Sequence, residues 1–499
     1  MGYPPQGVGG AGGIADAGAL EDSYIELFKK KDPRAARLFP YVELLYNAGK
    51  LTIDEIASYI NDVLSPPVVA TVFERMFSAE FSASVINSTN LSVSKVATIF
   101  NDENLSVSKA AMIINHENFS ISKAVAIISH ENLSVSKAAT IINHENLSVS
   151  KAYNIITHED LSADRTQEIL YNIPFGTKLV DVLTYGAGDL TVSSNTTISG
   201  VNRYNTLTVN SGITLTINGQ PGALIVKNLN CYGSIAKSAT GGAGGAPGAD
   251  GAGRGGNGGG GLIIFVDSFR NIGTISADGV NGENGSTVAA SASGGTGGSG
   301  VFYRVGRDTA GTGGNGGTGF SGGTGYGNVN GGGGGGTFST SRGGDGGIST
   351  YTNFDSYMEL ADEVKKAVID WIIVNVWGKS PTTTKNIPNM YGSGGGGGGA
   401  ADAYSASGGG GGGGGEIVIL CTSLYNIGTV SANGGNGGDG GTDGAQDACG
   451  GGGGGGIVYV LYKTLVDTGT LQAAGGAHGA TADRHGTDGT AGTAKAVQI

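Results

Sequence analysis

The sequence predicts a multidomain chain in which short α-helical repeats are followed by a β-strand repeat array interleaved with glycine-rich segments. Two observations support this fold class. A 14-residue phrase recurs seven times between residues 77 and 174. A strand phrase, clearest over Gly261–Gly279, returns from Gly415 and again from Gly456. A fixed repeat length of this kind is typical of arrays in which each unit stacks on its neighbours.

The composition limits the possible classes of protein. Glycine supplies 97 of the 499 residues, and such tracts order only if hydrogen bonds between segments replace the missing side-chain burial. The net charge of −12 argues against nonspecific nucleic-acid binding, which needs a basic surface. Three cysteines give no disulfide framework, and no long apolar run predicts a membrane span. The N-terminus lacks a secretory signal pattern.

Composition and periodicity divide the chain into five parts. Residues 1–20 are expected to form a flexible leader, and residues 21–76 a helical anchor domain. The seven 14-residue repeats occupy residues 77–174, and a linker is expected over 175–188. Residues 189–499 are expected to form a β/polyglycine head.

Each 14-residue unit is predicted to be one short helix. In the unit that begins at Leu105, Ser106 is the N-cap, Leu105 and Ala110 form a hydrophobic staple, and Ile113 and Ile114 complete the apolar face. Helices in series that bury one another's faces would give an α-solenoid. The alternative is one continuous coiled coil, because 14 is twice seven. However, the apolar residues occupy five of the seven heptad positions, which is too many for a narrow seam.

The strand units are predicted to contain a first strand, a turn of the type Asn/Asp-x-Gly-Thr, and a second short strand. A looser copy begins at Gly222, and a half copy occupies Val301–Val305. A helix inserted over residues 354–378 interrupts the array; we expect Asp355 to cap it and Gly378 to end it.

The glycine runs suit a polyglycine-II conformation, which is an extended left-handed helix with three residues per turn. Runs such as Gly408–Gly415 and Gly450–Gly456 carry no side chains, so several of these helices can pack side by side. Their N–H and C=O groups would then pair between segments, as buried polar groups must. Any side chains would lie at edges and tips.

Glycine-rich segments that alternate with variable loops resemble the distal adhesins of some bacteriophage tail fibres, which are sandwiches of polyglycine-II helices. The strand phrases over residues 195–217 and the units containing Gly-Thr-Ile-Ser-Ala also resemble tail-fibre proteins of spindle-shaped archaeal viruses. The resemblance covers residues 185–499 and does not include the 14-residue repeats. It implies an extracellular, virion-borne, non-enzymatic adhesin that binds a glycan or protein receptor on the host surface. Residues 1–76 would attach to other tail proteins.

Aromatic side chains near the glycine tracts are the candidates for receptor contact, because a polyglycine lattice has no room for them and such rings stack on sugars. The alternative is that these rings cap the ends of the lattice against water. The candidates are Phe320, Tyr326, Phe338, Tyr351, Tyr391 and Tyr404, together with Trp371 and Trp377 of the inserted helix.

Two sets of polar residues recur with the 14-residue repeat. His116, His130, His144 and His158 follow the repeat length rather than a metal-ligand spacing, so we interpret them as turn residues. The second set begins Asn-x-Ser sequences, which are candidate glycosylation sites, although Asn before a Ser N-cap also suits a turn. Its members are Asn90, Asn104, Asn118, Asn132 and Asn146.

No residue pattern predicts a catalytic group or a cofactor. Gly434–Asp439 matches a calcium-binding β-roll phrase only in part, which makes Asp439 a weak calcium candidate. The carboxylates of the inserted helix suit a solvated face better than a glycosidase pair. We therefore expect an adhesin. We also expect a homo-oligomer, most simply a trimer, because exposed glycine-rich edges and short helices favour association. The alternatives are a cell-surface filament protein and a carbohydrate-cleaving β-solenoid enzyme.

Overall fold

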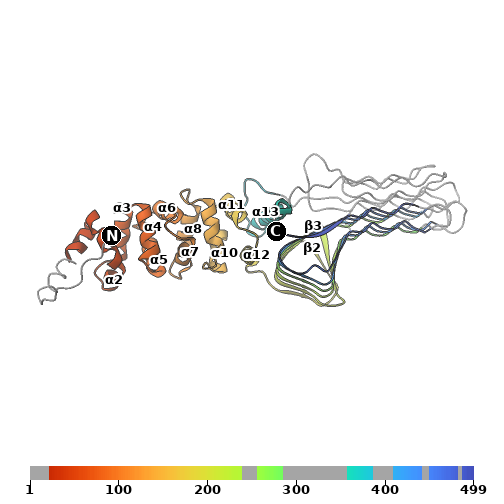
Figure 1. The fold of residues 1–499 in the computed structure, drawn as a ribbon, viewed down its shortest axis with the longest axis horizontal. Coiled ribbons are helices and arrows are strands. Elements are labelled where there is room, and N and C mark those ends of the chain that lie inside the picture. The colour runs from red at the N-terminus through yellow and green to blue at the C-terminus, as the bar shows by residue number, and fades with distance from the viewer. Residues whose placement is uncertain (1–21, 239–254, 285–356, 386–407, 441–448, 481–485) are drawn as a thin grey trace. The chain divides into compact units, whose positions relative to one another are not determined.

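The computed structural model describes residues 22–238, 255–284, 357–385, 408–440, 449–480 and 486–499. Contacts between residues divide the chain into two units. The helical unit comprises the chain up to Pro174 together with Ile373–Thr383, and the sheet unit comprises Phe175–Ile372 and Thr384–Ile499. Figure 1 shows the helices of the first unit and the sheet of the second. The leader expected over residues 1–20 and the half copy at Val301–Val305 lie outside the described residues.

The helical unit consists of short helices joined by tight turns. Residues 22–29 are helical. The following helices are η1 (Pro33–Tyr41), α2 (Val42–Asn47), α3 (Ile53–Val63), α4 (Pro66–Arg75), α5 (Ala79–Asn87), α6 (Val93–Asn101), α7 (Val107–Asn115), α8 (Ile121–Ser129), α9 (Val135–Asn143), α10 (Val149–Thr157) and α11 (Ala163–Asn172).

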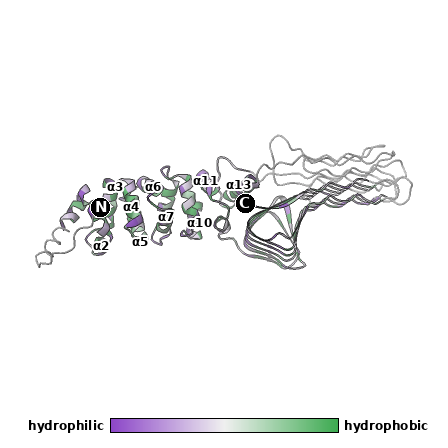
Figure 2. Ribbon diagram, in the orientation of Figure 1, coloured by the Kyte–Doolittle hydropathy of each residue, from purple (hydrophilic) through white to green (hydrophobic). Residues whose placement is uncertain are grey.

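Each 14-residue repeat forms one separate helix, as the sequence predicts. In α7 the Ser106 hydroxyl accepts the N–H of Lys109 at 3.1 Å, so Ser106 is the N-cap. Leu105 and Ala110, the predicted staple pair, are both fully buried. Figure 2 shows apolar and polar residues around the same short helices. Because turns separate the helices, the continuous coiled coil is wrong.

Successive helices alternate between two columns. Helices α3, α5, α7, α9 and α11 contact one another in one column, and α4, α6, α8 and α10 in the other. The repeat lysine links neighbouring layers of a column. Lys123 Nζ donates to the carbonyl of Leu91 at 3.1 Å, and Lys151 Nζ donates to that of Phe119 at 2.6 Å. The residue that ends a helix adds a link between the two columns, since Asn115 at the end of α7 accepts the N–H of Ser148, the N-cap of α10, at 2.9 Å.

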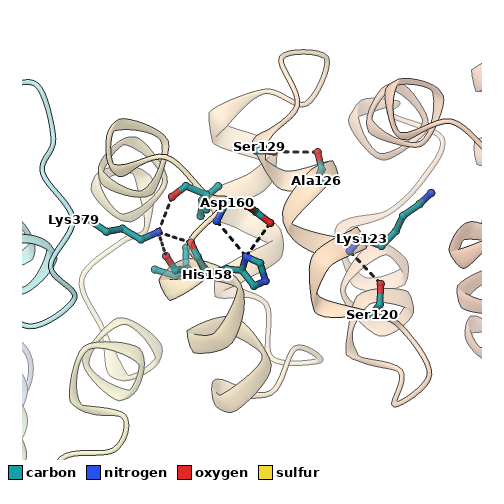
Figure 3. Close-up of polar contacts among 9 residues, drawn as sticks. Ser120, Lys123, Ala126, Ser129, His158, Asp160 and Lys379 are labelled. Carbon is teal, nitrogen blue, oxygen red and sulfur yellow. Dashed lines mark hydrogen bonds and ion pairs between the residues drawn. The ribbon is translucent and has the colours of Figure 1, made fainter.

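The last layer of the helical unit is completed from a distant part of the sequence. Lys379 donates to the carbonyls of Ile156, His158 and Leu161 at 3.1, 2.8 and 2.7 Å. Figure 3 shows the Lys379 side chain reaching toward His158. This is the role that repeat lysines have in earlier layers. The ring of Trp377 packs edge-on against Tyr153 at 6.1 Å between centroids.

The sheet unit is built on parallel strands. Their bounds are β1 (Leu190–Val192), β2 (Thr196–Val209), β3 (Thr214–Cys231), β4 (Ser234–Lys237), β5 (Gly261–Asn271), β6 (Thr274–Ser276), β7 (Glu416–Asn426), β8 (Thr429–Ser431), β9 (Ile457–Asp467), β10 (Thr470–Gln472) and β11 (Thr493–Gln498). The strand phrases at 261, 415 and 456 each form a long strand, a turn and a short strand, as predicted.

These strands form one parallel sheet that is nearly closed. The long strands β3, β5, β7, β9 and β11 pair in that order, and β3 also pairs with the short strands, which continue as β4, β6, β8 and β10. An apolar core lies within the sheet, where Leu229, Phe269 and Leu424 occupy equivalent positions of successive rungs. Equivalent positions of the repeated strand phrase therefore pair with one another in the sheet.

The turns between long and short strands require glycine. A Cβ on Gly273 would lie 1.8 Å from the carbonyl oxygen of Gly233 in the preceding rung, and one on Gly428 would lie 2.1 Å from that of Gly273. Asparagine side chains support the same turns. The amide of Asn271 donates to Asn426 at 2.8 Å, and that of Asn426 donates to the carbonyl of Thr468 at 2.6 Å.

Two helices belong wholly or partly to the sheet unit. The segment expected as a linker over 175–188 contains α12 (Thr177–Thr184), which packs on β3 and β5. The preceding Phe175 contacts the ring of Phe265 at 5.1 Å, so the segment is part of the core rather than a spacer. The inserted helix is α13 (Tyr357–Asn375). Gly378, with a φ of 66°, follows it as predicted, whereas Asp355 lies outside the described residues.

Replacing Lys151 by Met is expected to lower the free energy of unfolding by about 1–3 kcal/mol, because the carbonyls of His116 and Phe119 lose a charged donor while the apolar stem remains. Urea denaturation measures this change. The same substitution at exposed Lys30 is the control and is expected to have little effect. Equal stability of the two variants would show that the lysine does not link the layers.

Candidate functional site

The described glycine segments of the sheet unit pair with one another through their backbones. The N–H groups of Gly409, Gly412 and Gly415 donate to the carbonyls of Glu283, Val280 and Ala277 at 2.8–2.9 Å. Those of Gly411 and Gly414 donate to Gly451 and Gly454, both at 2.8 Å. Each neighbouring segment is therefore contacted at every third residue.

These segments are buried by backbone alone. All residues of 408–415 and 449–456 are buried. A Cβ on Gly411 would lie 1.9 Å from the carbonyl oxygen of Gly435, and one on Gly453 would lie 2.0 Å from that of Gly412. Because van der Waals contact needs a much larger separation, an alanine fits at neither position without moving the backbone.

A row of short polar side chains borders the array at every third position. Asp278, Asn281 and Asn284 accept the N–H groups of Asn433, Asn436 and Asp439 at 2.6–2.8 Å. The side chains of Asn433, Asn436 and Asp439 in turn accept backbone N–H groups of the next segment at 2.6–2.9 Å. The donors are Ala474, Ala477 and Ala480. The calcium candidate Asp439 is thus a member of this row. In the described part of the chain, no group of three or more His, Cys, Asp or Glu side chains is placed to hold a metal ion.

The described structure covers only part of the predicted receptor-contact residues. Phe320, Tyr326, Phe338, Tyr351, Tyr391 and Tyr404 lie outside the described residues. Trp371 lies half-buried in α13. Trp377 lies half-buried in the helical unit, where it packs against Tyr153.

The recurring histidines and asparagines take part in the turns between repeat helices. The Nδ1 atoms of His130 and His144 accept the N–H groups of Asn132 and Asn146, both at 3.2 Å. Figure 3 shows the corresponding turn at His158 and Asp160.

Four of the five candidate glycosylation sites use their side-chain amides in hydrogen bonds, and the fifth, Asn118, uses its backbone N–H. Asn132 donates to Ser94 at 2.9 Å and Asn146 to Ser108 at 2.8 Å, in both cases across to an earlier repeat. Asn90 donates to the carbonyl of Asp54 and Asn104 to Asp102, while the backbone N–H of Asn118 donates to His116.

The carboxylates of α13 lie among lysines. Asp362 contacts Lys365 at 3.0 Å and also contacts Lys366, and Glu363 lies 3.3 Å from Lys385. In the described part of the chain, no helix has the length and hydropathy to cross a bilayer. The three cysteines are free thiols and are buried.

Comparison of the chain with protein-family models, curated proteins and solved structures gives no match. The case for a function therefore depends on the geometry of the molecule itself.

Lys237 is a feature that the sequence reasoning missed. It ends β4 and faces the core beside Gly222 and Gly260, and its side chain is only 4% exposed. Its Nζ has no hydrogen-bond partner in the described structure. Burial lowers the pKa of Lys237 to about 8. The alternation Ser234, Ile235, Ala236, Lys237 is the signal for an inward side chain, since Ile235 faces the core.

Lys237 is expected to make stability depend on pH. Its pKa is about 8 in the folded chain and about 10.4 when unfolded, so the unfolded chain binds more protons between these values. The free energy of unfolding should therefore rise by about 2–3 kcal/mol from pH 8 to pH 10.4 through this group. Subtracting the urea-denaturation profile of Lys237→Met from that of the wild type isolates the effect. A flat difference would contradict it.

Gly453→Ala is expected to destabilise the sheet unit by about 3 kcal/mol or more, because its Cβ would collide with backbone that cannot rotate away. Gly188→Ala is the matched control, since no atom lies within 4 Å of the added Cβ. Thermal unfolding of the two variants measures the difference. Similar midpoints would contradict the close backbone packing.

Proposed function

We propose that this chain is a non-enzymatic structural protein of a virion, of the tail-fibre or spike type, which attaches the particle to a host cell surface. The observation that supports the proposal is the backbone hydrogen bonding between glycine segments, which makes a platform almost free of side chains. The finer fold is part of this proposal: we infer that the glycine segments are polyglycine-II helices and that the helical unit is an α-solenoid.

The three-residue step supports the polyglycine-II assignment. A helix with three residues per turn presents the same face at every third residue. Gly409, Gly412 and Gly415 donate to one neighbour, and Gly411 and Gly414 donate to another. The carbonyls of Gly410 and Gly413 accept from Gly256 and Gly259 in a third segment. A helix with three residues per turn has three faces, and in a packed bundle each face can pair with a different neighbouring segment.

The positions of the candidate contact residues in the sequence, between glycine segments, support the proposal. Residues 277–284, 432–440 and 473–480 lead away from short strands, and residues 408–415 and 449–456 lead back into long strands. The stretches that join them therefore start and finish at the ends of glycine segments remote from the strands. The stretch between residues 284 and 408 contains the eight receptor-contact candidates, of which Trp371 belongs to α13 and Trp377 packs within the helical unit.

A rigid support favours binding because loops that are held in place lose less conformational entropy when they meet a partner. The glycine segments supply rigidity, and the side chains placed at their ends supply recognition.

In this proposal residues 1–76 join the chain to other particle proteins, and the assembled protein is a homo-oligomer, most simply a trimer. The partner on the cell is a surface glycan or protein.

Attachment of the purified, fluorescently labelled chain to host cells tests the function. The triple variant Tyr326→Ala, Tyr391→Ala and Tyr404→Ala is expected to bind at least tenfold more weakly, because each ring contributes about 1 kcal/mol. Tyr41→Ala, which removes an exposed ring of the helical unit, is the control.

Immunogold electron microscopy of purified particles locates the protein independently. Gold at the distal ends of fibres is the expected result. Gold along filaments made only of this chain, or wild-type protein that does not attach to cells, would contradict the proposal.

A further inference from the structure

A group of two half-buried tyrosines and one exposed arginine lies where the long strands end. The guanidinium carbon of Arg270 lies 5.5 Å from the ring centre of Tyr232 and 5.6 Å from that of Tyr425. One guanidinium nitrogen also donates to the Tyr232 hydroxyl at 3.3 Å. Two cation–π contacts thus hold the arginine side chain in one place. We call these three residues the Tyr–Arg–Tyr row.

The strand register places two members of this row side by side, and the turn after β3 supplies the third. Arg270 of β5 pairs with Tyr425 of β7, and Tyr232 follows the last residue of β3. Phe269 and Leu424, the residues just before, face the core, so Arg270 and Tyr425 face outward. Neighbouring strands lie about 4.8 Å apart, which places Arg270 beside Tyr425. The residue of β3 that pairs with Arg270 is Asn230, and Tyr232 lies two residues beyond it, in the turn, where the Arg270 side chain reaches its ring.

The charge of Arg270 is not balanced within the described structure. The side chain is exposed, and none of the ion pairs found among the described residues includes it. The two ring contacts fix this cation in place, although the chain as a whole carries a net charge of −12. A guanidinium of this kind presents a planar set of donors that suits carboxylate or sulfate.

The surroundings of the row favour a sugar over a protein partner. Two residues earlier on the same outward face, Ser268 of β5 is paired with Ser423 of β7, which is paired with Thr464 of β9. These hydroxyls form a second row parallel to the first. Beside the first row, Ile272 and Ile427 are 37% and 49% exposed. The carboxylate of Asp467, paired with Tyr425 on the side away from Arg270, accepts the N–H of Gly469 at 3.0 Å. The hydroxyl groups, the apolar edges and the cation of Arg270 on the other side of Tyr425 match the hydroxyl groups, ring faces and acidic groups of an acidic sugar chain.

We propose that the Tyr–Arg–Tyr row binds an anionic glycan, whose carboxylate or sulfate pairs with Arg270 while its rings lie along Tyr232 and Tyr425. The sugar chain crosses the strands, and its hydroxyls meet the row of Ser268, Ser423 and Thr464. This inference rests on the proposed function, because it names the class of receptor that an adhesin of this kind would contact.

Binding of the full chain to three immobilised polysaccharides tests the site. Polygalacturonate carries carboxylates, heparin carries sulfates, and dextran is neutral. The wild type is expected to bind one or both acidic polymers and not dextran. Arg270→Ala should weaken that binding at least tenfold, Arg270→Lys should restore it only in part, and Tyr425→Ala should also weaken it.

Arg37→Ala is the matched control, since it removes the same charge from an exposed position in the helical unit. It is expected to change binding less than twofold. An equal loss in Arg37→Ala would mean that only net charge matters and would overturn the site. Absence of binding to both acidic polymers, or equal binding to dextran, would also overturn it. Matching thermal unfolding of the variants confirms that they are folded.

Cell attachment separates this inference from the proposed function. If labelled wild type and Arg270→Ala attach to cells equally well, the glycan site is wrong and the adhesin function stands. If the wild type fails to attach to cells but binds an acidic polymer through Arg270, the site stands and the adhesin function is wrong.

Discussion

The pairing of backbone N–H and C=O groups between glycine segments is the constraint on which the sheet unit depends. Buried amides must find partners, and here they find them in neighbouring segments rather than within their own. Residues 408–415 lie among residues 256–259, 277–283 and 451–454, and each neighbour takes hydrogen bonds at a three-residue step. The absence of side chains is what permits this approach, because a Cβ would meet a carbonyl oxygen at about 2 Å. Glycine therefore acts here as a core residue.

The helical unit solves a related problem in a different way. The turns between short helices leave carbonyl groups without helical partners, and a lysine supplied by a later layer donates to them. Lys123 and Lys151 do so within the repeats, and Lys379 does so from a segment that follows α13. Burial lowers the pKa of each of these lysines, which reflects how far they reach between the layers. In both units, groups from one repeat satisfy the backbone of another.

Local signals in the sequence predicted the features that are local in the structure. Ser106 caps its helix because the N-cap preference concerns only a few neighbouring residues, and the Asn-x-Gly-Thr phrase marks turns because its glycine meets the preceding rung. Features that depend on distant residues were missed. The segment that contains α12 was expected to be a linker, but it packs on strands β3 and β5, which lie later in the sequence. The positions of Lys379, Lys237 and Arg270 among their neighbours depend on repeats far away in the chain.

Amide hydrogen exchange of the glycine segments tests the central claim most directly. If backbone pairing makes these segments a solid core, the amides of 408–415 and 449–456 that donate between segments will exchange as slowly as those of strands β5 and β7. The amides of Ala474 and Ala477, whose acceptors are side chains at the border of the array, will exchange faster. Exchange throughout 408–415 and 449–456 at the rate of an unstructured chain would contradict the account.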